Sequence, residues 1–185
     1  MPDRPAVSGA SATLRTVLVL VTLLTTGVAA TGCASSAPPP TPAVIRSTPP
    51  PWDVPVDGVS SIAAAGLEPQ PLDLTTNQHQ VQLSISIDGQ PVSLAPQIGV
   101  DVKRGVQAPV HTHDASGTVW LEGRDADQIT LGQFFTVWGV RFTDTCLGAA
   151  CGVVLVTTQP ALDVTDPRAL ALASVQNVAV TVRSG

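Results

Sequence analysis

Hydrophobic and polar residues alternate in the second half of the chain, which is the pattern of strands with one buried face. Residues 81–87 read Val-Gln-Leu-Ser-Ile-Ser-Ile, and Asp88-Gly89 then supplies a two-residue hairpin turn before a return strand at 90–94. Further strands are predicted at residues 109–113, 118–122, 140–143, 153–158 and 175–183. The pattern therefore predicts a mainly β domain.

One segment has helical spacing instead. Leu131, Phe134 and Trp138 recur at helical intervals, Thr130 is a suitable N-cap, and Gly139 is a suitable end. We expect these apolar side chains to belong to the core rather than to a ligand pocket. The elements fit a small single-domain sandwich, which we favour, and they also fit a β-grasp-like sheet with one short helix.

The first 30 residues have the layout of a signal peptide. Arg4 and Arg15 precede residues 17–30, an apolar stretch of about 14 residues. A helix that spans a membrane needs about 20 apolar residues, so this stretch is short for one. We therefore expect an exported protein whose leader is removed.

The end of this leader resembles the cleavage box of bacterial lipoproteins. Residues 30–33 read Ala-Thr-Gly-Cys, and Ser, Ala and Pro follow. The resemblance implies a signal peptide over 1–32, a diacylglycerol thioether on Cys33, and an amide-linked acyl chain such as palmitate. Two or more chains give stable anchoring, so the protein is expected on the outer face of the cell membrane. The alternative is an ordinary cleaved signal that ends beside a cysteine.

Prolines are dense after Cys33, at positions 38–40, 42, 49–51 and 55. This density opposes a helix or a central strand, and it predicts a Pro/Ser/Thr-rich tether over residues 33–75 that reaches at most about 130 Å. Trp52 is then an isolated aromatic, or it packs loosely on the domain, or it marks a docking point. The folded domain is expected over residues 76–185.

Composition and charge exclude several classes of function. The chain has 185 residues, 12% of them charged, and a formal net charge of −5, which becomes −6 without residues 1–32. This length supports one domain, and no basic cluster is present to bind nucleic acid. Ser116 lacks the context of a nucleophilic serine, and the chain offers no other pair of nucleophile and base. We therefore do not expect an enzyme.

Two cysteines remain once Cys33 is assigned to the lipid. Cys146 and Cys151 form an even pair in a compartment where disulfides persist, so a disulfide bond is predicted. Closing a loop of this size stabilises the fold by about 2 kcal/mol on the loop-entropy model. Two reduced thiols and a redox-active pair are the alternatives, and the spacing is not that of a CxxC motif.

The histidines form the candidate metal site. His111 and His113 are two residues apart on a predicted strand, so both imidazoles face the same side. If the strand that carries His79 lies next to them, three imidazoles can bind Cu²⁺ or Zn²⁺, with Asp114 or Glu122 as an oxygen ligand or as its supporting acceptor. The alternative is that His111 and His113 are polar residues near a turn.

The same region resembles a family of small extracytoplasmic bacterial and archaeal domains, often membrane-anchored, with the motifs HTHDxSGxxHxE and TLGxFFxxWG. The matching segments here are residues 111–122 and 130–139, and residues 79–89 resemble the family's opening HxHLxIxxNG. Trp120 stands where the family has the histidine of GxxHxE, and Val81 or Asn77 stands where it has a second opening histidine. The resemblance implies a fold and a location rather than a mechanism.

These observations predict a membrane-anchored lipoprotein whose β domain is a binding or interaction module, without catalysis, with a cell-surface protein as a partner. The alternative is a metal-binding lipoprotein that holds Cu or Zn through His79, His111 and His113. A third hypothesis is a metal-dependent enzyme with an open coordination position.

Overall fold

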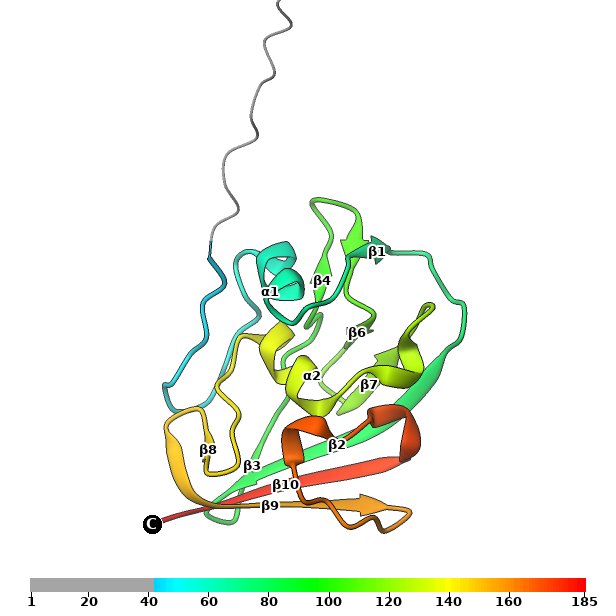
Figure 1. The fold of residues 1–185 in the computed structure, drawn as a ribbon. Coiled ribbons are helices and arrows are strands. Elements are labelled where there is room, and N and C mark those ends of the chain that lie inside the picture. The colour runs from blue at the N-terminus through cyan, green and yellow to red at the C-terminus, as the bar shows by residue number, and fades with distance from the viewer. Residues whose placement is uncertain (1–41) are drawn as a thin grey trace, which may run out of the picture. The chain divides into compact units, whose positions relative to one another are not determined.

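The computed structural model describes residues 42–185, and strands dominate them (Figure 1). The mainly β fold class is therefore confirmed. The signal peptide and the lipidation of Cys33 were predicted for a part of the chain that lies outside the described residues. No helix in residues 42–185 is long and apolar enough to cross a membrane.

The main sheet has the strand order β6-β7-β2-β10-β9-β8, and β3 also pairs with β2. The parallel pair β2 and β10 lies in its middle, and its other neighbouring strands are antiparallel. Its strands are β2 (His79–Ile87), β3 (Gln90–Val92), β6 (Val110–His111), β7 (Thr118–Leu121), β8 (Cys146–Leu147), β9 (Ala150–Gln159) and β10 (Asn177–Ser184).

The alternating pattern of β2 and β10 places their apolar residues on one face of the sheet. Val81, Leu83 and Ile85 are buried on β2, whereas the intervening Gln82 and Ser84 are exposed. On β10, the buried side chains are Val178, Val180 and Val182. One face of the sheet therefore forms the floor of the core.

The connections give the β-grasp-like arrangement rather than a sandwich. The hairpin β2–β3 comes first, helix α2 (Leu131–Trp138) follows, and the pair β9–β10 then returns so that β10 lies parallel to β2. A second sheet consists of the two-residue strands β1 (Gln70–Pro71), β4 (Val100–Asp101) and β5 (Val106–Gln107). Strands this short do not form the second layer of a sandwich.

Local sequence explains the predicted turn and helix. Asp88 and Gly89 both have positive φ, at 50° and 80°, as a tight hairpin turn requires. The predicted helix is α2, where the Thr130 side chain accepts from the Gln133 N–H at 3.2 Å and the Gln133 side chain accepts from the Thr130 N–H at 2.9 Å. Gly139 ends it in the left-handed conformation.

Two predicted strands largely disappear in the structure. The segment 140–143 contributes only isolated bridges, in which Val140 pairs with Arg46 and Phe142 pairs with Leu147. Residues 109–113 contain the two-residue strand β6, because the chain bends away after His111 and the Thr112 hydroxyl accepts a hydrogen bond from the Ile98 N–H at 3.0 Å. Contacts made by loops thus replace the predicted ladders.

The prediction that the tether extends to residue 75 is wrong, because part of this segment belongs to the core. Trp52 is only 3% exposed, and its ring meets that of Trp138 edge to face with centroids 5.5 Å apart. The Trp52 indole N–H donates to the Thr48 carbonyl at 2.9 Å, and the Trp138 indole N–H donates to the Trp52 carbonyl at 3.3 Å. The prolines around Trp52 keep residues 47–56 out of helices and strands, but they do not prevent this segment from packing in the core.

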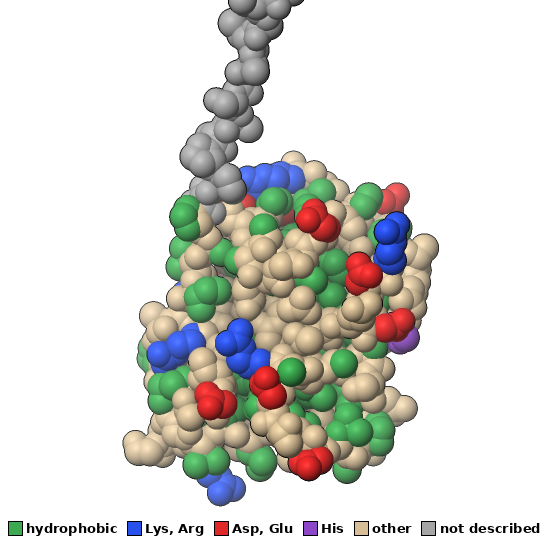
Figure 2. Space-filling view, viewed as in Figure 1, with side chains coloured by type: hydrophobic (Ala, Val, Ile, Leu, Met, Phe, Trp, Pro, Cys, Tyr) green, Lys and Arg blue, Asp and Glu red, His purple; other side chains and the backbone are tan. Residues whose placement is uncertain are grey.

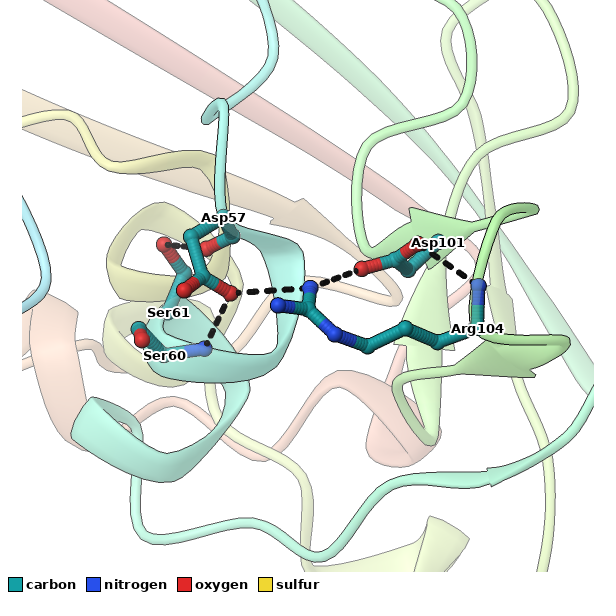
Figure 3. A network of polar contacts seen from close by, with 5 residues as sticks. All are labelled: Asp57, Ser60, Ser61, Asp101 and Arg104. Carbon is teal, nitrogen blue, oxygen red and sulfur yellow. Dashed lines mark hydrogen bonds and ion pairs between the residues drawn. The ribbon is translucent and has the colours of Figure 1, made fainter. Parts of the chain in front are cut away.

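A second helix, α1 (Gly58–Ala64), also lies within the predicted tether. Asp57 caps it by accepting from the Ser60 N–H at 3.2 Å (Figure 3), and Ile62 is fully buried. The fold therefore has two α-helices in residues 42–185 instead of the one predicted. Its other helical turns are the 3₁₀ segments Ala126–Gln128, Pro167–Ala169 and Leu172–Ser174.

The compact unit that contains the described residues begins at Pro39 rather than at residue 76. Arg46 joins the start of this unit to the end of α2, since its N–H donates to the Gly139 carbonyl at 2.8 Å and its carbonyl accepts from the Arg141 N–H at 2.9 Å. A segment that forms a β-bridge at only one residue can thus belong to the core, although its sequence shows no alternation of polar and apolar residues.

Trp52→Ala tests this earlier start of the domain. The change removes a buried indole from the core, so we expect it to lower the free energy of unfolding by about 3–5 kcal/mol, and we expect the same of Trp138→Ala. Urea unfolding of the mature chain measures both. Val56→Ala is the control, because Val56 is fully exposed and surface changes stay within about 0.5 kcal/mol. An unchanged midpoint for Trp52→Ala would restore the tether prediction.

Candidate functional site

His111 lies at the end of β6 and is fully buried. Its Nδ1 atom is 3.1 Å from the carbonyl oxygen of Ala108. A carbonyl only accepts, so Nδ1 carries the proton and donates. In the neutral ring, Nε2 therefore holds a lone pair, and the position of this lone pair is set by the Ala108 contact.

The ring of His113 stands between the rings of His111 and Trp120. Its Nε2 atom lies 3.1 Å from the Nε2 atom of His111, and the two rings are stacked with centroids 5.1 Å apart. On its other side, His113 stacks on Trp120 at 4.8 Å with an angle of 9° between the planes. His113 is exposed and Trp120 is half-buried, so His113 connects the buried His111 to the surface.

The carboxylate of Glu122 lies beneath this stack and is 3% exposed. Its Oε2 atom accepts from the Gln107 side-chain amide at 2.9 Å and lies 4.0 Å from His111 Nε2. Its Oε1 atom accepts from the side-chain amide of Gln78. A buried carboxylate is costly unless it is hydrogen-bonded, and both oxygens have a partner here.

The environment of His111 keeps its ring neutral. Burial lowers the pKa of His111 below its ordinary value, and this effect exceeds the rise caused by the Glu122 carboxylate and the hydrogen bond to Ala108. Both ring nitrogens are then assigned, with the proton on Nδ1 and the lone pair on Nε2 aimed at His113. An unprotonated Nε2 of this kind is the form of histidine that binds metals.

The five residues predicted as metal ligands do not come together. His111, His113 and Glu122 form one cluster, but His79 Nε2 lies 2.8 Å from Asp127 Oδ1 instead, and Asp114 accepts from the Ser116 N–H at 2.9 Å. In residues 42–185, no group of three or more His, Cys, Asp and Glu side chains is arranged to hold a metal ion. The predicted five-residue site is therefore corrected to a pair of histidines beside one carboxylate.

Sheet topology explains why His79 is separate. A site with three histidines required the strand of His79 to lie next to the strand of His111, but β7 lies between β2 and β6. Leu121 on β7 is the register partner of His79 on one side and of Val110 on the other. Strands in a sheet are about 4.8 Å apart, so two spacings separate His79 from the other histidines.

Three residues of the cluster were not identified from the sequence. Trp120 was noted only as the replacement for a family histidine, yet it is the register partner of His111 and the stacking partner of His113. Gln107 on β5 and Gln78, just before β2, hold the carboxylate, and no motif in the sequence marks either glutamine. The pairing of the predicted strands 109–113 and 118–122 could have identified Trp120, because it places Trp120 opposite His111.

The disulfide prediction is confirmed by the structure. Cys146 and Cys151 are bonded, and they are register partners at the start of the hairpin β8–β9. The turn between them passes Trp52, and a Cβ atom at Gly148 would collide with the Trp52 ring. The disulfide thus closes a hairpin that also covers one side of the aromatic core.

The burial of His111 predicts a pH dependence of stability. The unfolded chain takes up a proton on His111 near its ordinary pKa of 6.5, whereas the folded chain does so only at a lower pH. The unfolded state therefore binds more protons as the pH falls through this region, and folding stability falls with it. We expect His111→Gln to lose less stability than the wild type between pH 7.5 and pH 5 in urea unfolding.

An NMR titration of the His111 ring in the wild type measures the pKa of this ring directly. It therefore checks the cause of the pH dependence without a substitution. A His111 signal that titrates at or above its ordinary pKa would contradict the assignment, as would an identical loss of stability in His111→Gln.

Comparison with known proteins adds no name to this site. No protein family matches the chain, and neither a curated protein nor a solved structure is detectably similar to it. The resemblance of residues 111–122 and 130–139 to an extracytoplasmic family stays a prediction, and the function must be inferred from the residues described above.

Proposed function

We propose that the chain is a lipid-anchored bacterial lipoprotein whose β domain is a non-catalytic binding module on the outer face of the cell membrane. The observation that carries the proposal is the start of the compact unit at Pro39, six residues after Cys33. Arg4, Arg15 and the apolar stretch 17–30 have the layout of an exported leader, and the domain begins shortly after the cysteine that ends it.

The acyl chains proposed on Cys33 would attach the domain to the membrane. Two or more acyl chains hold a protein stably, whereas one chain gives only marginal binding. The chain from Cys33 to Pro42 spans at most about 30 Å when it is fully extended. The anchor therefore keeps the domain close to the lipid surface, instead of the 130 Å away that the longer tether predicted.

The His111–His113–Trp120 stack supports binding rather than catalysis. The rings of His113 and Trp120 reach the surface, and their positions are set from beneath by His111 and Glu122. Side chains held in place before a ligand arrives lose little freedom on binding. Within residues 42–185, the hydrogen bonds of His111 and His113 do not include a Ser, Thr or Cys side chain, so the cluster lacks an activated nucleophile.

Cys33→Ser tests the anchor. We expect the wild type to be recovered with membranes, with a mature N-terminus at Cys33 and a mass increased by the lipid, and we expect Cys33→Ser to be released or left unprocessed. Intact-mass measurement of the membrane and soluble fractions reads both results. Ser35→Ala is the control, because it changes a neighbouring residue and keeps the cysteine. A Cys33→Ser protein with the same lipid mass would contradict the anchor.

A metal ion is the second candidate for the function, and one distance favours it. The Nε2 atoms of His111 and His113 face each other at 3.1 Å, which places both within reach of one cation at ordinary metal–nitrogen lengths of about 2.0–2.1 Å. Imidazole suits Cu²⁺ and Zn²⁺. Water would complete the coordination, and the Glu122 carboxylate 4.0 Å from His111 Nε2 would offset the added charge.

Metal titration of the mature, untagged chain tests this candidate. We expect one Zn²⁺ or Cu²⁺ per chain in calorimetry, and we expect His111→Ala/His113→Ala to lose the binding. His79→Ala is the matched control and should keep it, because His79 lies beside Asp127 and apart from the pair. Binding that survives the double change, or that is lost in His79→Ala, would exclude the histidine pair as the site.

A further inference from the structure

We propose that the end of the domain where the chain enters is a membrane-docking face that rests on the bilayer holding the lipid anchor. This face, called the entry face below, is formed by residues 43–46, 53–57 and 101–104. The inference rests on the proposed anchor at Cys33. It adds that the domain has one orientation at the membrane instead of moving freely above it.

Exposed apolar side chains gather on the entry face. In residues 42–185, nine large hydrophobic side chains are exposed, and five of them belong to the entry face: Val44, Ile45, Val54, Val56 and Val102. Val56 is fully exposed, and Val102 is 63% exposed in the turn between β4 and β5. Exposed apolar groups of this density mark contact with a partner or a membrane.

The entry face lies at one end of the fold. Figure 1 shows α1, the turn between β4 and β5, and the start of the described chain at the same end, away from β9 and β10. A hollow of about 520 Å³ opens there, and its walls include Val44, Val54, Val56, Arg46 and Arg104. In Figure 2, hydrophobic side chains are visible beside the point where the described chain begins. The apolar side chains thus lie around Pro42, where the described chain begins.

Charges on the entry face balance, whereas those elsewhere do not. Arg104 pairs with Asp57 at 3.2 Å and with Asp101 at 2.6 Å (Figure 3), and the carboxylate of Asp53 acts on Arg46. With Lys103, the face carries three basic and three acidic side chains. The other described residues carry four basic and ten acidic side chains, so they hold the whole excess of negative charge.

This distribution orients the domain at a membrane that contains anionic lipid. The described residues outside the entry face are acidic, so a negative membrane surface repels them. This repulsion acts within about one Debye length, or 8–10 Å. The neutral, apolar entry face is not repelled and gains from burial of its valines. Both effects turn the same end of the domain toward the lipid.

The length of chain outside the structure identifies the bilayer as the occupant. Cys33 and Pro42 are separated by at most about 30 Å of extended chain. A folded unit of this size is about 37 Å across, from a radius of gyration of about 15 Å. The connection is therefore shorter than the domain is wide, so the surface beside Pro42 is the part held nearest to the lipid.

Site-specific fluorescence on the lipidated, full-length mature protein tests the docking. A polarity-sensitive dye is attached to Val102→Cys on the entry face, or to Leu155→Cys on β9, where Leu155 is 52% exposed. The native cysteines do not interfere, since Cys146 and Cys151 are bonded and Cys33 carries the lipid. Each protein is reconstituted into vesicles of phosphatidylethanolamine and phosphatidylglycerol.

We expect a blue shift and a loss of quenching by an aqueous quencher for the dye at position 102, with no such change at position 155. Adding Val56→Asp should restore quenching at position 102, because it places a charge on the entry face. Leu162→Asp is the control and should not restore quenching, because Leu162 lies outside the entry face. Equal quenching at both positions, or equal protection of both, would overturn the docking face.

The outcome also separates this inference from the anchor. If mass measurement shows no lipid and the protein does not sediment with vesicles, the proposed lipoprotein is wrong. If the protein is lipidated and sediments but the dye at position 102 stays exposed to the quencher, the anchor stands and the docking face fails.

Discussion

The packing of Trp52 against Trp138 is the interaction on which most of the fold depends. The chain has only six aromatic residues, all Trp or Phe, and five of them form one cluster in which each ring meets a neighbour. Helix α2 supplies three of the five. Trp52 brings the N-terminal segment to this helix, and the disulfide-closed hairpin then covers the Trp52 ring at Gly148. Three distant parts of the chain therefore share a single apolar centre.

A second constraint is the burial of a polar network beneath the surface histidine. His111 and Glu122 are buried in a small domain where each unpartnered polar group is expensive, and Ala108, Gln78 and Gln107 satisfy them. The network holds His113 against Trp120 at the surface. It gives the fold a rigid pair of imidazoles at the cost of burying a carboxylate, which is the reason that a ligand role is proposed for this cluster.

The early start of the domain changes how the proposed lipoprotein relates to its membrane. A tether of 40 residues would let a domain act at a distance, whereas a connection of nine residues keeps it at the lipid surface. Any partner must then be reached close to the bilayer. The neutral entry face and the acidic charge of the other described residues fit the proposed docking of one side of the domain on the lipid.

Local sequence was sufficient for the elements whose signals lie in neighbouring residues. The alternation of β2, the Asp88-Gly89 turn, the capped helix α2 and the Cys146–Cys151 bond all depend on contacts within a few positions. For the candidate site, the same reasoning found His111, His113 and Glu122 but wrongly added His79 and Asp114. It could not place β7 between β2 and β6, because strand order is set by packing of the whole sheet.

The sequence by itself determined that the domain is mainly β. It also predicted an export signal and a lipidation site at Cys33, and both stay proposals. Only the tertiary structure decided that Trp52 is core, that α1 belongs to the domain, and that Gln78 and Gln107 hold Glu122. The physical reason is the same in each case. A proline-rich segment and a glutamine carry no periodic signal, and their positions follow from burial and hydrogen bonding with residues that are distant along the chain.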